Sequence, residues 1–343
     1  MSTETPTPVP TPRPTPTPTT GYVPDTGTPA AGVRSVTVAT GPQRLGDRIF
    51  SGVSSAAGVV ILVVLAGVTL FLVFESLPVL GASPEEVDGE GGFLRYLAPV
   101  LFGTVLVAVL ALLIAFPFSL AIALFISHYA PRRLARPLGY VIDLLAAIPS
   151  VVYGLWGVQV VAPYVQPSYV WLADNLGFLP FFAGPASSNG RTVLTAGVVL
   201  AIMILPIMAA IDREVFLQTP TLHEEAALAL GATRWEMIRM AVIPYGKSGV
   251  VSGAMLGLGR ALGETIAVLL VLSASGGISL NLISRSNAPT IPSNIASNFP
   301  DATGLGLNVL IATGLVLFVI TFAVNFAARA VLARRADFDG AAG

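Results

Sequence analysis

Two oppositely charged residues interrupt an otherwise uncharged stretch of the sequence, Arg260 and Glu264 in GLGRALGET. On a continuous helix, residues at i and i+4 share one face, so we expect these side chains to be neighbours. A guanidinium group can donate two parallel hydrogen bonds to the oxygens of phosphate or a carboxylate. The pair therefore has two interpretations: a self-neutralising ion pair that joins helices, or an arginine that attracts an anion while the glutamate tunes or releases it.

Other side chains that could do chemistry are scarce. The chain has no cysteine, which excludes thiolate metal sites, disulfides and thiol nucleophiles, and its two histidines, His128 and His223, are far apart. We therefore expect no metal and no cofactor. Gly246–Ser248 resembles the end of an ATP-binding phosphate loop, but the leading glycine is replaced by Ala241, and Pro244 lies inside the segment. The chain is not expected to be an enzyme, and ATP hydrolysis must come from a partner.

The composition predicts an integral membrane protein. Of 343 residues, 54% are hydrophobic and 11% are charged, against about 25% charged in a soluble chain. So few charges cannot cover a soluble surface, and so many apolar residues exclude disorder throughout. The formal net charge of -1 provides no field that would attract nucleic acid. Membrane lipid is therefore an expected partner, and nucleic acid is not.

The apolar stretches predict an all-α, polytopic fold with six transmembrane helices, because roughly 20 apolar residues cross a bilayer. Asp143 lies in the third stretch, where it either pairs with Arg260 or a neighbouring subunit or extends to the membrane surface, and Pro149 interrupts that stretch. The predicted transmembrane domain covers residues 47–335. Its six spans are residues 55–74, 97–127, 138–161, 192–211, 248–274 and 302–328.

The distribution of basic residues predicts the orientation of the spans. Only Arg95, Arg191 and Arg285 fall in loops on one side, whereas most of the 18 basic residues fall on the other. The side rich in arginine is cytoplasmic by the positive-inside rule, so both termini should be cytoplasmic. Residues 1–46 contain a Thr-Pro run and predict a disordered cytoplasmic tail, either simply solvated or binding a partner.

The longest cytoplasmic connection, residues 212–247, predicts two short helices joined by a glycine turn. Thr221–Glu224 and Thr233–Glu236 each fit a capping box, in which hydroxyl and carboxylate groups satisfy free amides at a helix start. Gly231 follows the first helix, where a left-handed residue commonly ends a helix. The second helix should end before Pro244.

This connection resembles the EAA loop of ABC-importer permeases. The matching residues are Glu225, Ala226, Ala227 and Gly231, followed by a hydrophobic residue and Pro244. The resemblance implies a coupling helix that docks in a groove of an ATPase subunit. The alternative is an amphipathic helix that is merely solvated.

Three segments resemble the PstC-type permease subunits of high-affinity phosphate ABC importers: GAMLGLGRALGETIAV, AAIPSVVYGLWG and LTAGVVLAIMILP. The resemblance extends from about residue 46 to residue 333. It implies a type I ABC importer permease fold in the cell membrane, with Arg260 and Glu264 in the translocation of inorganic phosphate. The implied partners are a PstA-type permease, a PstB-type ATPase dimer and a PstS-type phosphate-binding protein.

Three other functions compete with this interpretation. The chain could be a permease for another oxyanion, sulfate or molybdate, with the same architecture. It could instead be a signalling subunit that reports phosphate status without limiting transport. A self-sufficient ion channel would not explain the coupling-loop motif.

Overall fold

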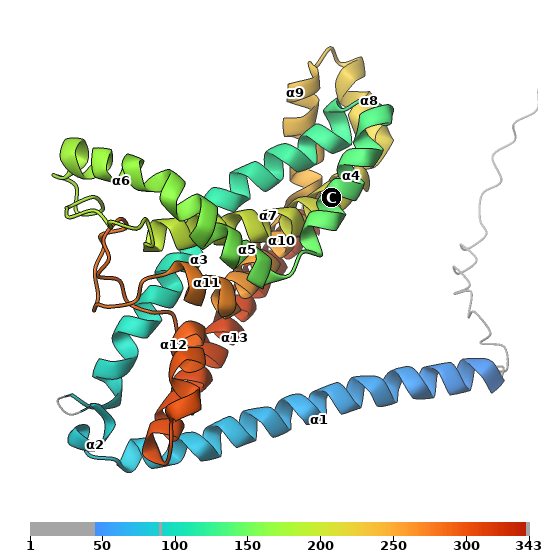
Figure 1. Cartoon of the computed structure of the whole chain (residues 1–343). Helices are drawn as coiled ribbons and strands as arrows, with labels where there is room; N and C mark the ends of the chain where they lie inside the picture. The colour runs from blue at the N-terminus through green and yellow to red at the C-terminus, as the bar shows by residue number, and fades with distance from the viewer. Residues whose placement is uncertain (1–44, 89–90, 341–343) are drawn as a thin grey trace, which may run out of the picture. The chain divides into compact units, whose positions relative to one another are not determined.

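The computed structural model describes residues 45–88 and 91–340, and every regular element in these residues is a helix (Figure 1). The predicted all-α fold is confirmed. The Thr-Pro run of the predicted tail lies outside the described residues. The α-helices are α1 (Leu45–Gly81), α2 (Pro84–Asp88), α3 (Gly92–Leu124), α4 (Arg132–Ala146), α5 (Ser150–Trp156), α6 (Ala162–Leu176), α7 (Val193–Leu217), α8 (Thr221–Ala229), α9 (Arg234–Met237), α10 (Ile243–Gly263), α11 (Ile266–Val271), α12 (Ile291–Asn298) and α13 (Leu305–Gly340).

Short π-helical and 3₁₀ turns extend several of these helices. The π-turns are η1 (Phe125–Tyr129), η2 (Gly157–Val161) and η3 (Ile238–Val242), and η4 (Phe299–Asp301) is a 3₁₀ turn. The chain divides into two units, residues 1–59 and 60–343. The described residues of the first unit form the beginning of α1, and the second unit contains all the other elements.

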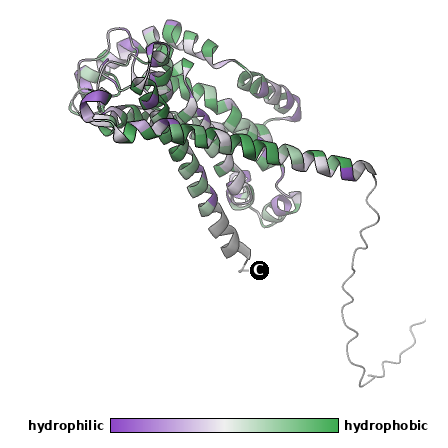
Figure 2. Cartoon of the chain, turned by 90° about the horizontal axis from the view of Figure 1, so that it is seen from below, coloured by the Kyte–Doolittle hydropathy of each residue, from purple (hydrophilic) through white to green (hydrophobic). Residues whose placement is uncertain are grey.

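Four helical segments in the described residues are long and apolar enough to cross a membrane: Arg48–Gly81, Gly92–Tyr129, Val193–Leu217 and Leu305–Ala330. A fifth span would be the pair Arg132–Ala146 and Ser150–Leu176, which is bent by 89°. Hydrophobic residues predominate along these helices, as Figure 2 shows. The polytopic fold is confirmed, but the number of six spans is not.

The two remaining predicted spans are broken at identifiable residues. In the third, Pro149 adopts an extended conformation (φ -59°, ψ 138°) and caps α5, so α4 ends at Ala146 and the chain turns sharply. In the predicted span of residues 248–274, α10 ends at Gly263 and Glu264 is extended (φ -69°, ψ 124°) before α11 begins at Ile266. Proline removes a backbone donor and glycine disfavours a helix interior, which explains why neither segment is one continuous helix.

The packed core of the second unit lies between α3 and α7. Ala108, Ala111 and Ala115 on α3 are fully buried against α7, where Ile204 is fully buried as well. Gly197 on α7 faces Leu110 on α3, and an added Cβ there would approach the Cβ of Leu110 to 3.1 Å. Small residues let two helix backbones approach closely, and membrane helices associate through such packing. This pair provides the scaffold that α10 then joins.

The predicted helix–turn–helix is present as α8 and α9, which lie next to each other in Figure 1, but two of its predicted boundaries are wrong. Thr221 is the first helical residue and Pro220 is the N-cap, so the capping box predicted at Thr221–Glu224 does not form. The second helix does not end before Pro244, because it continues through η3 into α10. In η3, the amide of Ile243 donates to Ile238, a π-type bond. This wider turn places the proline at the start of α10, where its missing donor costs little.

Candidate translocation and coupling sites

Arg260 lies in the last turn of α10 and faces a cleft of about 890 Å³. The Nε atom of Arg260 is buried, and among the described residues this side chain forms no hydrogen bond or ion pair. A second arginine, Arg329 of α13, lines the same cleft. The described lining residues include no carboxylate; they are Ile207, Ser252, Met255, Leu256, Gly259, Arg260, Phe322, Asn325, Phe326, Ala328 and Arg329. The cleft therefore has an uncompensated positive charge.

Glu264 is not the ion-pair partner of Arg260 in this structure, and the prediction that both lie on one face of a continuous helix is wrong. Glu264 follows the end of α10, and the residue is 9% exposed. Its Oε1 accepts a hydrogen bond from the amide of Ala267 at 3.1 Å. The hydroxyl of Thr265 donates to the carbonyl of Gly263 at 3.2 Å. These two bonds satisfy backbone and side-chain groups at the break, so Glu264 fixes the start of α11 and leaves the guanidinium of Arg260 unpaired.

The glycines near Arg260 have two different surroundings. An added Cβ at Gly257 would lie 2.6 Å from the sulfur of Met208 on α7, and one at Gly253 would lie 3.0 Å from Oδ1 of Asp212. These two glycines allow α10 to pack closely against α7. Gly259 and Gly263 have no atom within 4 Å of an added Cβ, and Gly259 lines the cleft. Of these four glycines, only Gly253 and Gly257 therefore form a packing surface.

Asp212 is a buried acidic residue that the sequence did not single out. It is fully buried on α7, and its Oδ2 accepts a hydrogen bond from the hydroxyl of Ser119 on α3 at 3.1 Å. Its Oδ1 has no partner and faces Gly253 of α10. The carboxylate therefore lies where α3, α7 and α10 meet. The sequence carried one signal for a helical Asp212: residues compatible with a helix continue from Asp212 to Leu217. The helix α7 accordingly extends beyond residue 211, where the predicted span ended.

The EAA residues lie on α8 and in the turn that follows it. Glu225 and Ala226 are exposed, while Ala227 packs against the apolar cluster formed by η3 and its neighbours. Gly231 has a φ of 87°, and its amide donates to Leu228 at 3.0 Å while the next amide, of Ala232, donates to Ala227 at 3.2 Å. These two bonds are the Schellman pattern that closes a helix with a left-handed glycine. The predicted glycine turn is confirmed.

The capping box at the start of α9 is also confirmed. The amide of Glu236 donates to the hydroxyl of Thr233 at 3.3 Å, and the carboxylate of Glu236 accepts from the amide of Thr233 at 2.8 Å. The hydrogen bond from the backbone of Thr233, followed by the one from its hydroxyl, lowers the pKa of Glu236. Both bonds are exposed and local, as expected for a turn whose geometry is set by adjacent residues.

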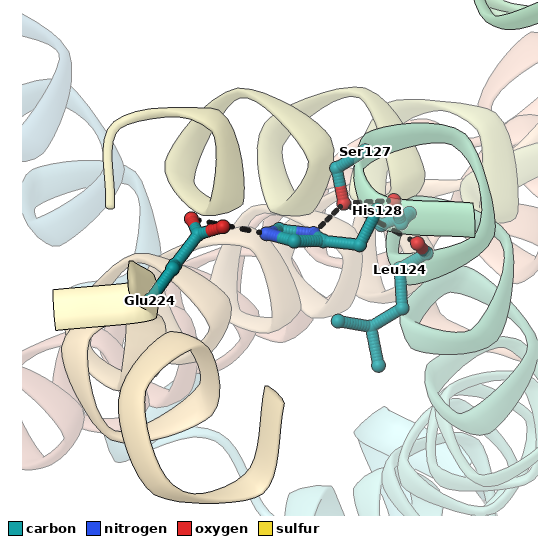
Figure 3. A network of polar contacts seen from close by, with 5 residues as sticks. Leu124, Ser127, His128 and Glu224 are labelled. Atoms are coloured by element: carbon teal, nitrogen blue, oxygen red, sulfur yellow. Dashed lines mark hydrogen bonds and ion pairs between the residues drawn. The ribbon is translucent and has the colours of Figure 1, made fainter. Parts of the chain in front are cut away.

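A polar network ties α8 to the end of α3 (Figure 3). Nε2 of His128 lies 3.4 Å from Oε1 of Glu224, and Nδ1 of His128 lies 2.7 Å from the hydroxyl of Ser127. The Ser127 hydroxyl also lies 3.4 Å from the carbonyl of Leu124. The described residues contain no group of His, Cys, Asp or Glu that could hold a metal ion. His128 therefore links η1, which continues α3, to α8.

The helices of membrane length and the arginine-lined cleft are features of a membrane transport protein. A family model described as "Binding-protein-dependent transport system inner membrane component" matches residues 115–337 of this chain. The chain belongs to this family. It is therefore a multi-pass component of the inner membrane, as expected from its apolar helices.

Individual relatives and solved structures agree with this membership. The chain is 45% identical over 308 residues to the phosphate transport system permease protein PstC 2 of Mycobacterium tuberculosis, covering 86% of this chain and 94% of the relative. It is 41% identical over 302 residues to the phosphate transport system permease protein PstC of Mesorhizobium japonicum, covering 84% and 91%. These relatives confirm the predicted PstC-type family.

Two solved transporters share the fold at low sequence identity. One is the MetNI methionine ABC transporter in an inward-facing conformation, with a TM-score of 0.52 and 15% identity over 70% of this chain and 97% of that one. The other is a bacterial ABC transporter involved in the import of alginate, with a TM-score of 0.51 and 17% identity over 83% and 99%. The predicted ABC importer permease fold is confirmed by these likenesses.

Proposed function

We propose that this chain is the permease subunit of an ATP-driven importer of inorganic phosphate and forms half of the translocation pathway. The observation that carries the proposal is the cleft containing Arg260 and Arg329, with no carboxylate among its described lining residues. Guanidinium groups recognise phosphate oxygens through paired hydrogen bonds, and an unpartnered Nε retains that capacity. The names of the relatives support phosphate as the substrate.

Within this function, Arg260 and Glu264 have separate roles in translocation. Arg260 attracts the anion electrostatically and contacts it during transport. Glu264 holds the break between α10 and α11 through its bond to the amide of Ala267. A broken span provides a point at which the end of α10 can move relative to α11, which alternating access requires.

Coupling to ATP hydrolysis is assigned to the surface of α8 and its turn, Glu225–Ala227 and Gly231. The support is the exposure of large apolar side chains around this surface: Leu222 is 73% exposed, Leu230 91% and Trp235 55%. Such side chains in a polar connection are expected at a protein–protein interface, where a partner covers them. We assign that partner as a PstB-type ATPase dimer, which hydrolyses ATP on behalf of this chain.

The remaining partners follow from the same function. A PstA-type permease forms the other half of the pathway, and a PstS-type binding protein delivers phosphate from outside. This arrangement requires α8 on the cytoplasmic side, and the arginine-rich loops support both termini on that side as well.

The substrate is tested by uptake of radiolabelled phosphate into proteoliposomes that contain the whole complex, with sulfate and molybdate as competitors. Unlabelled phosphate should suppress uptake, and a large excess of sulfate or molybdate should not. Stronger suppression by sulfate or molybdate than by phosphate would contradict the assignment. Purification of the tagged chain followed by mass spectrometry tests the partners, and recovery without an ATPase subunit would contradict the coupling role.

A further inference from the structure

A second cavity, of about 670 Å³, lies between α4, α7 and the start of α8, away from the cleft of Arg260. Three arginines line it: Arg132 and Arg136 from α4 and Arg213 from α7. Among the described residues, none of these three side chains forms a hydrogen bond or ion pair. The Nε atom of Arg213 is buried without a partner. Three guanidinium groups thus converge on one cavity with their donors unused.

The arrangement is built into the packing of the helices. Arg132 and Arg136 are four residues apart on α4, so they share a face, where like charges repel one another unless an anion lies between them. Nη1 of Arg213 occupies the position that a side chain at residue 139 would fill, and only the glycine found there leaves it room. Gly139 is buried on the same face of α4, one turn beyond Arg136. The guanidinium of Arg213 is therefore held against α4 rather than extended into solvent.

Two carboxylates also line the cavity, Asp143 and Glu224. The carboxylate of Glu224 is already engaged by His128 at 3.4 Å, as Figure 3 shows. Asp143 forms no ion pair with any of the three arginines among the described residues. The three guanidinium groups therefore exceed the available negative charge, and a monoanion or dianion would complete the balance.

We infer that this cavity is a binding site for a phosphate group, distinct from the translocation cleft. Planar guanidinium groups bind phosphate oxygens through paired hydrogen bonds, and three of them line this one cavity. Two sources present this chemistry: free inorganic phosphate and the headgroup of an anionic phospholipid. The second source is compatible with the exposed apolar side chains of α4, Leu134, Val141 and Leu144. A phosphate bound here links α4, α7 and the helix that carries Glu224.

The test uses the full chain in nanodiscs of phosphatidylcholine, with Arg260→Gln and Arg329→Gln in every sample so that neither arginine of the translocation cleft contributes. Binding of radiolabelled inorganic phosphate is measured at equilibrium for this parent and for versions that add Arg136→Gln, Arg213→Gln or Arg133→Gln. Arg133 is exposed on the same helix but does not line the cavity, so it is the matched control. Losing one charge-assisted contact should weaken binding about tenfold or more, whereas the control should bind as the parent does.

A second arm exposes the same samples to phosphatidylglycerol and measures the lipid retained after purification by native mass spectrometry. Loss of phosphate binding in the Arg136 and Arg213 variants identifies free phosphate as the ligand. Loss of retained phosphatidylglycerol in those variants, with phosphate binding absent throughout, identifies the lipid headgroup. Equal results for parent, cavity variants and control in both arms would overturn the inference, as would an equal loss in the Arg133 control. Because Arg136 is exposed, its variant remains informative if the Arg213 variant fails to fold. None of these results depends on transport, so failure here is separable from failure of the proposed function.

Discussion

Gly231 ends the coupling-type helix in a conformation that other residues adopt at a cost, which makes it a sharp test of that assignment. Its φ is 87°, and nothing lies within 4 Å of an added Cβ, so a substitution is opposed by backbone strain alone. For Gly231→Ala we expect the free energy that keeps the turn closed to fall by roughly 1–2 kcal/mol. The open form of the turn should then be populated roughly 5- to 30-fold more. Gly231→Asn should lose less, because asparagine tolerates this region, and Gly231→Val should lose most.

The assay is hydrogen exchange of the amides of residues 231 and 232, which donate to Leu228 and Ala227, together with phosphate transported per ATP hydrolysed. Exchange should accelerate in the order Gly, Asn, Ala, Val, and transport per ATP should fall in the same order. Gly306→Ala is the control, since Gly306 is helical and also has space for a Cβ, so it should be neutral or slightly stabilising. Equal exchange in all the Gly231 variants would refute the strain argument, and unchanged coupling despite accelerated exchange would refute the coupling role.

Three further predictions concern packing and titration. Ser119→Ala removes the hydroxyl that donates to Oδ2 of buried Asp212 and should cost about 1–3 kcal/mol, measured as a lower thermal unfolding temperature; an unchanged temperature would contradict the burial of that carboxylate. Gly257→Leu should impair assembly, because the added side chain overlaps the sulfur of Met208, whereas Gly259→Ala should be tolerated. Expression levels and size-exclusion profiles of the two variants test this difference. The pKa of Glu236 is lowered from 4.5 in the folded state. Its carboxylate therefore stabilises the start of α9 at pH values above the pKa of the unfolded state, and this stabilisation is lost as the pH falls through the pKa of the folded state. The protection factors of the α9 amides, which are their exchange rates normalised to the intrinsic rate at each pH, should therefore fall on acidification, and Glu236→Gln should remove that dependence; identical protection-factor profiles would contradict it.

Features set by adjacent residues were predictable from the sequence. The capping box at Thr233 and the left-handed turn at Gly231 each depend on groups within a few residues, and both form as expected. The membrane class followed from composition, because an 11% charged fraction leaves no soluble alternative. The box predicted at Thr221 failed because Pro220 precedes it and takes the N-cap position, which the spacing rule alone does not consider.

Features set by tertiary packing were not predictable. The spacing of Arg260 and Glu264 is compatible with one helix, but α10 ends at Gly263, and the Glu264 carboxylate accepts a hydrogen bond from an amide in the first turn of α11. Asp212 resembles the first residue of a loop until α3 and α10 are placed around it. Arg329 follows directly on the last predicted span, residues 302–328, and only the packing of α13 against α10 brings it to the cleft.

The central claim, that Arg260 contacts the transported anion, is tested most directly by the initial rate of phosphate uptake into proteoliposomes containing the whole complex with Arg260→Gln. We expect near-complete loss of uptake in a complex that still assembles, with partial recovery in Arg260→Lys, which restores the charge without the planar fork. Arg133→Gln, which alters an exposed arginine outside the cleft, should transport normally. Uptake by Arg260→Gln at the rate of the unmodified complex would show that Arg260 does not contact the transported anion.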